Sequence, residues 1–169
     1  MPRYRRLLPV LLLPAALFLA GCGPRSSTSG STLRYALQSP PTTLDPARVE
    51  DGDTIDMLQQ VFEGLVQWNE KSELVPNIAE KWEISEDGTV YTFHLKEGVK
   101  FHNGRGLTAA DFVYSMTRCA LMGESPTAET YLNDVAGAMQ ARAAKGKAVR
   151  GLKALDERTL QIAIDKRRP

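Results

Sequence analysis

Two histidines, His94 and His102, lie close together in the stretch FHLKEGVKFHNG and are the only histidines in the chain. Such a pair suggests either a metal site or an acid–base pair. A zinc site needs about three or four side-chain ligands, and the nearby carboxylates of Glu97 and Asp111 do not stand at a recognisable ligand spacing. We therefore expect His94 to be a strand residue and His102 a turn residue, with no metal ion and no cofactor.

The remaining reactive side chains do not suggest catalysis. The sequence has no G-x-S-x-G nucleophile elbow and no pairing of Cys or Ser with His. Asp45, Glu50 and Asp51 could form a carboxylate pair, but a solvated loop and a helix start account for them better, because negative charge is favourable at a helix N-terminus. Cys119 stands in an apolar helical pattern that is typical of a small core residue. The sequence predicts no catalytic residue and no enzyme; an exported hydrolase is the alternative.

The first elements of the chain are predicted from local patterns. Branched, aromatic and apolar residues indicate a short strand over 33–37, and the three prolines of SPPTTLDP exclude continuous helix or central strand after it. Apolar residues at helical spacing predict a helix within 53–65, with Asp53 or Thr54 as its N-cap.

Two hairpins and two helices are expected farther along. Strands at 81–85 and 89–95 flank an Asp-Gly turn, and Trp82 is expected to face the aromatic side of the second strand. That side carries Tyr91, Phe93 and Leu95. Thr108 and Asp111 resemble a capping box at the start of a helix. A second helix is predicted over much of 128–145, and a second hairpin pairs 150–155 with 159–165.

The N-terminus carries processing signals. Arg3, Arg5 and Arg6 precede an apolar run over 7–20, which is interrupted by two prolines and is too short for a membrane span of about 20 residues. The run ends in LAGC, which looks like the lipobox of bacterial lipoproteins. This resemblance implies that residues 1–21 are a lipoprotein signal peptide and that Cys22 is the lipidated first residue of the mature protein. Residues 22–32 then have the composition of a flexible linker.

The charge of the mature part excludes one class of partner. Removing residues 1–21 takes away three arginines and leaves 18 basic against 20 acidic residues. A nucleic-acid-binding protein would show a basic face instead, so we expect no nucleic acid partner. The basic stretch 142–150 is interpreted as a solvated helix end and loop, although contact with a permease or anionic lipid is an alternative. With Cys22 lipidated, Cys119 has no cysteine left for an internal disulfide.

Several motifs, in order along the chain, resemble one family. They are TLDP (43–46), FEGLVQW, ELVPNIAEKWEISEDGTVYTFHLKEGVKFHNGRGLTAADFVYSM (73–116) and ALDERTLQIAID. This series is similar to the extracytoplasmic solute-binding proteins of the peptide and nickel type, which are the receptors of ATP-driven (ABC) importers. One departure is Gly106, where the family often has proline.

The resemblance implies an α/β fold of the type II periplasmic-binding-protein class with an additional accessory domain. Residues 33–59 would begin ligand-binding lobe I, and residues 60–169 would form a truncated accessory domain. The chain is thus expected to be an N-terminal fragment that does not bind a solute tightly by itself.

The same resemblance implies a function, a set of partners and a location. The protein would be a monomer, exported and held on the membrane by its N-terminal lipid, that delivers a peptide or similar small solute to an ABC permease. In peptide binders the loop before L-D-P contributes ligand contacts, which points to Ser39, Pro40, Pro41 and Thr42. The two prolines lack an N–H donor, so contacts there would use carbonyls, Ser39, Thr42 or apolar surface. A sensory or chaperone role on the same fold is a further alternative.

Overall fold

The computed structural model describes residues 34–167. Its internal contacts separate the residues up to Ala36 from a unit that begins at Leu37, and all of the described helices and strands belong to this second unit. The predicted signal peptide, Cys22 and the linker 22–32 lie outside the described residues. Within 34–167, no helix has both the length and the apolar character that crossing a membrane requires.

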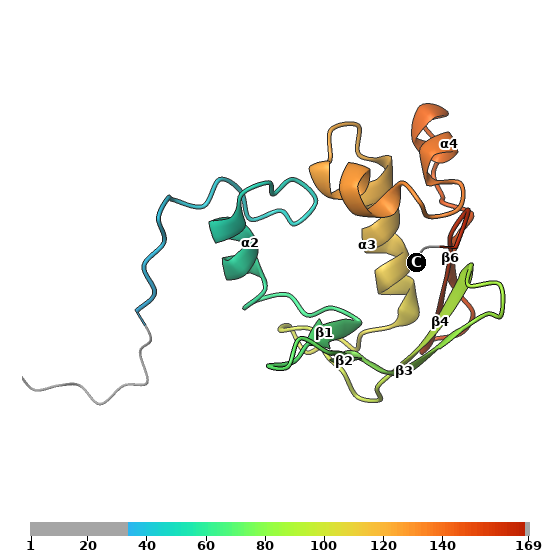
Figure 1. Cartoon of the computed structure of the whole chain (residues 1–169), viewed down its shortest axis with the longest axis horizontal. Helices are drawn as coiled ribbons and strands as arrows, with labels where there is room; N and C mark the ends of the chain where they lie inside the picture. Colours follow the sequence, from blue (N-terminus) through green and yellow to red (C-terminus); the bar gives the residue numbers. More distant parts are fainter. Residues whose placement is uncertain (1–33, 168–169) are drawn as a thin grey trace, which may run out of the picture. The chain divides into compact units, whose positions relative to one another are not determined.

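The centre of the unit is a four-stranded antiparallel sheet with the order β3-β4-β6-β5 (Figure 1). Its strands are β3 (Ala79–Ile84), β4 (Val90–Leu95), β5 (Leu152–Ala154) and β6 (Thr159–Ala163). Both predicted hairpins are confirmed. They join through β4 and β6, whose register runs from Val90 opposite Ala163 to His94 opposite Thr159.

Local turn chemistry fixes the first hairpin. Gly88 has a φ of +69°, a left-handed conformation that glycine adopts without steric cost. The Asp87 carboxylate accepts the backbone N–H of Thr89 at 3.0 Å, which closes the turn. Trp82 stands opposite Phe93 in the register, with ring centroids 6.5 Å apart. The predicted aromatic pair across the hairpin is therefore confirmed.

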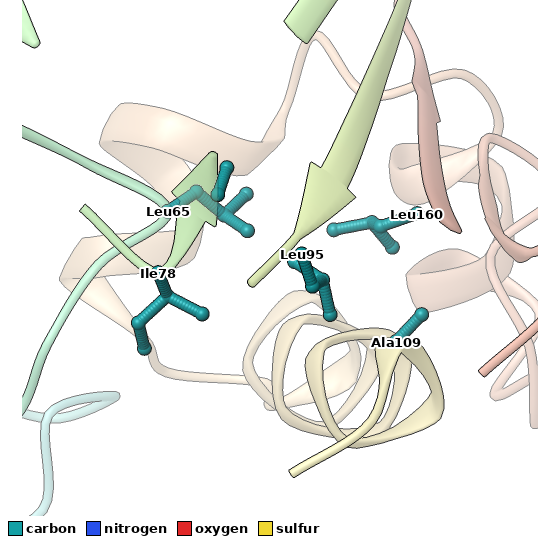
Figure 2. Packing of buried hydrophobic residues seen from close by; sticks show 6 residues of the cluster. Leu65, Ile78, Leu95, Ala109 and Leu160 are labelled. Carbon is teal, nitrogen blue, oxygen red and sulfur yellow. The ribbon is translucent and has the colours of Figure 1, made fainter. Parts of the chain in front are cut away.

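Helix α3 (Ala109–Leu121) packs against this sheet and closes the core. Leu95 and Leu160 from neighbouring strands meet Ala109 at the start of α3, and Leu65 and Ile78 extend the same cluster (Figure 2). The predicted N-terminal signal of α3 is confirmed. The Asp111 carboxylate accepts the backbone N–H of Thr108 at 2.9 Å, so a donor at the helix start is satisfied.

Helix α2 (Gly52–Leu58) is shorter than predicted and begins earlier. Its N-cap is Asp51, whose carboxylate accepts the backbone N–H of Thr54 at 2.8 Å; the prediction of Asp53 or Thr54 was wrong. Asp53 and Thr54 instead receive hydrogen bonds from the backbone of the preceding loop. The chain leaves the helix after Leu58 and enters an unpredicted hairpin of β1 (Val66–Trp68) and β2 (Leu74–Pro76).

Two further predictions were wrong. Residues 34–37 form no strand, because a strand needs a hydrogen-bonded neighbour and none of the described residues pairs with them. The predicted helix over 128–145 is divided into η2 (Ala128–Leu132, π-helical) and α4 (Ala138–Ala143). Between them the Ala136 N–H donates to Ala163 on β6 at 2.8 Å, and Gly137 has a φ of +79°. Pairing with the sheet and this left-handed residue interrupt the helix.

Candidate functional site

A groove of about 730 Å³ lies between two segments that are distant in the sequence. One wall is formed by the segment 46–50 and α2, and the other by residues 126–131, which lead into and form η2. A smaller hollow of about 420 Å³ adjoins it along α3. Both are lined by Pro46, Phe62, Thr127 and Tyr131. We refer to the 730 Å³ hollow as the groove.

The groove combines exposed aromatic rings with polar groups. Phe62 and Tyr131 line it and are 52% and 74% exposed. Glu50 and Glu129 line it as well, and both are exposed. A concave surface with apolar walls and a few polar groups is typical of small-molecule sites. Its chemistry suits a solute that has both apolar parts and hydrogen-bonding or charged groups.

An ion pair fixes the turn that begins the first wall. The Arg118 guanidinium on α3 contacts both carboxylate oxygens of Asp45, with Nη1 donating to Oδ1 at 3.0 Å. The same carboxylate accepts the backbone N–H of Ala47 at 3.1 Å. The hydrogen bond from Arg118 is the main cause that lowers the pKa of Asp45 to about 2. Asp45 is thus a partly exposed loop residue, as predicted, and in addition the ion-pair partner of Arg118.

Two hydroxyl groups join the walls directly. The Ser125 Oγ, which is buried, donates to the carbonyl of Ala47 at 2.6 Å and accepts the backbone N–H of Ala128 at 3.1 Å. The Thr127 Oγ1 donates to the carbonyl of Pro46 at 2.9 Å. These bonds connect residues about 80 positions apart, with separations of 78 and 81. The spacing of the groove therefore depends on two side chains from one short segment.

The four predicted ligand residues, Ser39, Pro40, Pro41 and Thr42, are exposed and do not line the groove. They lie beside the start of α2. The backbone N–H of Ser39 donates to the Asp53 carboxylate at 3.1 Å, and the Thr42 hydroxyl donates to Asp51 at 2.6 Å. This last bond is the main cause that lowers the pKa of Asp51. A ligand that accepted a hydrogen bond from the Ser39 N–H or the Thr42 hydroxyl would compete with these bonds. The role of all four residues stays a prediction.

The two histidines occupy the kinds of position that were predicted. His94 is on β4, with its Nε2 3.4 Å from a carboxylate oxygen of Glu83, and His102 is exposed in the turn after β4. Among residues 34–167, no three His, Cys, Asp or Glu side chains are grouped as metal ligands. Cys119 is 8% exposed and lies 3.4 Å from the Ser125 hydroxyl, so the prediction of a small core residue is confirmed.

Sequence reasoning missed most of the groove. Phe62 has the spacing of a core residue in a longer helix, and Glu50 looked like part of a solvated loop. Nothing local in the sequence links Glu50 with the segment 126–131. The walls meet through tertiary hydrogen bonds and through the buried cluster of Ala47, Cys119 and Ala128, and a sequence pattern does not show these contacts.

Comparison with known proteins identifies the family. Residues 73–169 match the model of the bacterial extracellular solute-binding proteins, family 5 Middle. The Escherichia coli protein named "Probable deoxycholate-binding periplasmic protein YgiS" is 37% identical over 137 residues, a match that covers 78% of this chain and 25% of the relative. The chain thus spans about a quarter of the length of this relative.

Two solved structures share the fold of the described unit. The Escherichia coli murein tripeptide-binding protein MppA has a TM-score of 0.68 at 37% identity, and the match covers 76% of this chain and 26% of MppA. Haemophilus influenzae OppA, in complex with the peptide RPPGFSPFR, has a TM-score of 0.70 at 32% identity, covering 76% and 26%. The predicted fold class, an α/β type II periplasmic-binding-protein fold present here in part, is confirmed. The chain belongs to the bacterial extracellular solute-binding proteins of family 5.

Proposed function

We propose that this chain is part of a solute-binding protein that captures peptides, or a similar small solute, outside the cytoplasmic membrane and delivers them to an ABC permease. The observation that carries the proposal is the groove, found on a chain of this family. Its apolar walls, exposed rings and hydrogen-bonding groups match what a peptide with variable side chains requires. The names of MppA and of the OppA complex, which both refer to peptides, support the same class of solute.

In this proposal the groove forms one side of a larger binding site. The other sides would come from parts of the fold beyond the start of lobe I (33–59) and the accessory domain (60–169). A ligand held on one side loses less water than an enclosed one and gains less free energy. The chain alone would then bind its solute weakly, and tight binding would need further surface from a second lobe.

A chimaera tests this function. Residues 34–167 would replace the matching quarter of the murein tripeptide-binding protein MppA, which supplies the rest of the fold and is the positive control. We expect the purified chimaera to bind peptides from a defined tripeptide pool in isothermal titration calorimetry. A Phe62→Ser variant in the groove should weaken binding, whereas Trp68→Ser, at an exposed position outside the groove, should not. A folded chimaera that binds none of the tripeptides would contradict the proposal.

We also propose that the protein is exported and anchored by a lipid on Cys22. The tripartite N-terminus and the LAGC sequence support this, and acyl chains contribute about 0.8 kcal/mol per buried CH₂ to membrane binding. In a bacterial host, the wild-type chain should fractionate with membranes, and mass spectrometry should find a diacylglycerol adduct on residue 22. The Cys22→Ser variant should lack the adduct. An unmodified wild-type Cys22 in the membrane fraction would refute the anchor.

A further inference from the structure

We infer that the groove selects solutes with positive charge, because it presents, on opposite walls, two carboxylates that have no partner among residues 34–167. This inference rests on the proposed function and narrows it to a class of peptide: one with a free amino group and a basic side chain. The two carboxylates belong to Glu50 and Glu129.

Both carboxylates are available to a ligand. Glu50 follows the turn that Arg118 and Ser125 hold in place, and Glu129 is in the first turn of η2. Both side chains are exposed. Neither side-chain carboxylate makes an ion pair or a hydrogen bond within residues 34–167. A cationic ligand group would therefore not have to displace an internal partner.

Among residues 34–167, the lining of the groove contributes no cation that would cancel this charge. In the described part of the chain, the residues that line the groove include no Lys, Arg or His. Arg118 lines the adjoining hollow, but its guanidinium is bound to Asp45 through two hydrogen bonds. Arg48 also approaches Asp45, with Nε 4.0 Å from Oδ2. Within the described residues, the lining of the groove thus holds two carboxylates and no cationic side chain to balance them.

The apolar lining favours the same class of ligand. Phe62 and Tyr131 expose aromatic rings to the groove. The faces of such rings attract ammonium and guanidinium groups, and the rings also cover the aliphatic stem of a lysine or arginine side chain. An acidic side chain would gain neither contact and would be repelled by both carboxylates. A basic peptide therefore fits the groove better than an acidic one of equal size.

Three matched tripeptides test the inference on the full chain, ¹⁵N-labelled and kept in solution with a non-ionic detergent. Binding of Ala-Lys-Ala, Ala-Ala-Ala and Ala-Glu-Ala would be measured by NMR titration at low salt. We expect groove amides to shift, with Ala-Lys-Ala bound about two- to fivefold more tightly than Ala-Ala-Ala, since an exposed ion pair has this effect. Ala-Glu-Ala should bind most weakly, and 0.5 M salt should reduce these differences.

Variants identify the carboxylates that are responsible. Glu129→Gln and Glu50→Gln should each weaken the binding of Ala-Lys-Ala about two- to fivefold. The binding of Ala-Ala-Ala should be less affected. The matched control is Glu86→Gln, which removes an exposed carboxylate in the first hairpin turn and should not change the binding of any of the three peptides. Equal binding of the three peptides at the groove would overturn the charge preference and leave peptide binding standing. If none of the three peptides shifts the groove amides, both the inference and the role of the groove in the proposed function would be overturned.

Discussion

The substitution Ser125→Ala tests how much the Ser125 hydroxyl contributes to holding the two walls of the groove together. In the wild-type chain this hydroxyl donates to the Ala47 carbonyl at 2.6 Å and accepts the Ala128 N–H at 3.1 Å. Ser125, Ala47 and Ala128 are all buried, with 1%, 5% and 0% of their surfaces exposed. Alanine would therefore leave one acceptor and one donor without a hydrogen bond and shielded from water.

The expected loss of stability follows from these two groups. A buried polar group that loses its partner costs about 1–3 kcal/mol. Thr127 still holds the neighbouring Pro46 carbonyl at 2.9 Å, so we use the lower half of that range. The free energy of unfolding should then fall by about 2–4 kcal/mol, and the melting temperature by about 6–12 °C for a chain of this size.

Urea unfolding followed by tryptophan fluorescence would measure this loss, because Trp82 is half-buried on β3. Amide hydrogen exchange at Ala128 should accelerate in the variant. Ser115→Ala is the control: this exposed hydroxyl donates to the Phe112 carbonyl of its own helix, and its removal should change stability by no more than about 0.5 kcal/mol. A Ser125→Ala variant as stable as the Ser115→Ala control would refute the assigned role of the hydroxyl.

Three further changes test the core, the sheet and the ion pair. Leu160→Ala removes a side chain with 0% exposure and should lower the unfolding free energy by about 2–5 kcal/mol in urea titrations. Gly151→Ala would place a Cβ 2.6 Å from a carbonyl oxygen of β6 and should cost at least about 1–3 kcal/mol, whereas Gly123→Ala, with open space around it, should be tolerated; equal effects of the two glycine changes would contradict the crowding. Asp45→Asn should be less stable than wild type at pH 7. Because the pKa of Asp45 is lowered from 3.8 to about 2, the stability from its pair with Arg118 is fully present above pH 3.8 and is lost as the pH falls through about 2. The variant and wild-type unfolding curves should converge there, and a difference that persists below pH 2 would exclude the ion pair as its cause.

The sequence predicted those features that depend on residues close together in the chain. The first hairpin follows from the Asp87-Gly88 turn, and the start of α3 follows from Thr108 and Asp111. The end of α2 was not predictable in the same way, because Phe62 continues the apolar helical spacing although it is 52% exposed beside the groove. Phe62 therefore forms part of an exposed surface and not of the hydrophobic core.

Long-range contacts account for the other differences between the predicted and the observed structure. Pairing of Ala136 with Ala163 divides the predicted helix, and the two residues are separated by α4 and the second hairpin. The candidate site depends equally on distant residues, since Ser125 must reach Ala47. The family motifs predicted the fold because they identify relatives, and they did not show which side chains form the groove.

The bonds between the turn at Asp45 and the region of α3 and η2 also determine an order of events during folding. They join positions 73, 78 and 81 residues apart, and contacts of such separation form slowly because a long loop must close first. A chain that is synthesised or exported from its N-terminus presents Pro46 and Ala47 well before Ser125 and Thr127 exist to bind them. We expect the first hairpin, whose two strands are close together in the chain, to form early and the groove to be completed later, so that the nascent chain has no finished binding surface until α3 and the start of η2 have emerged.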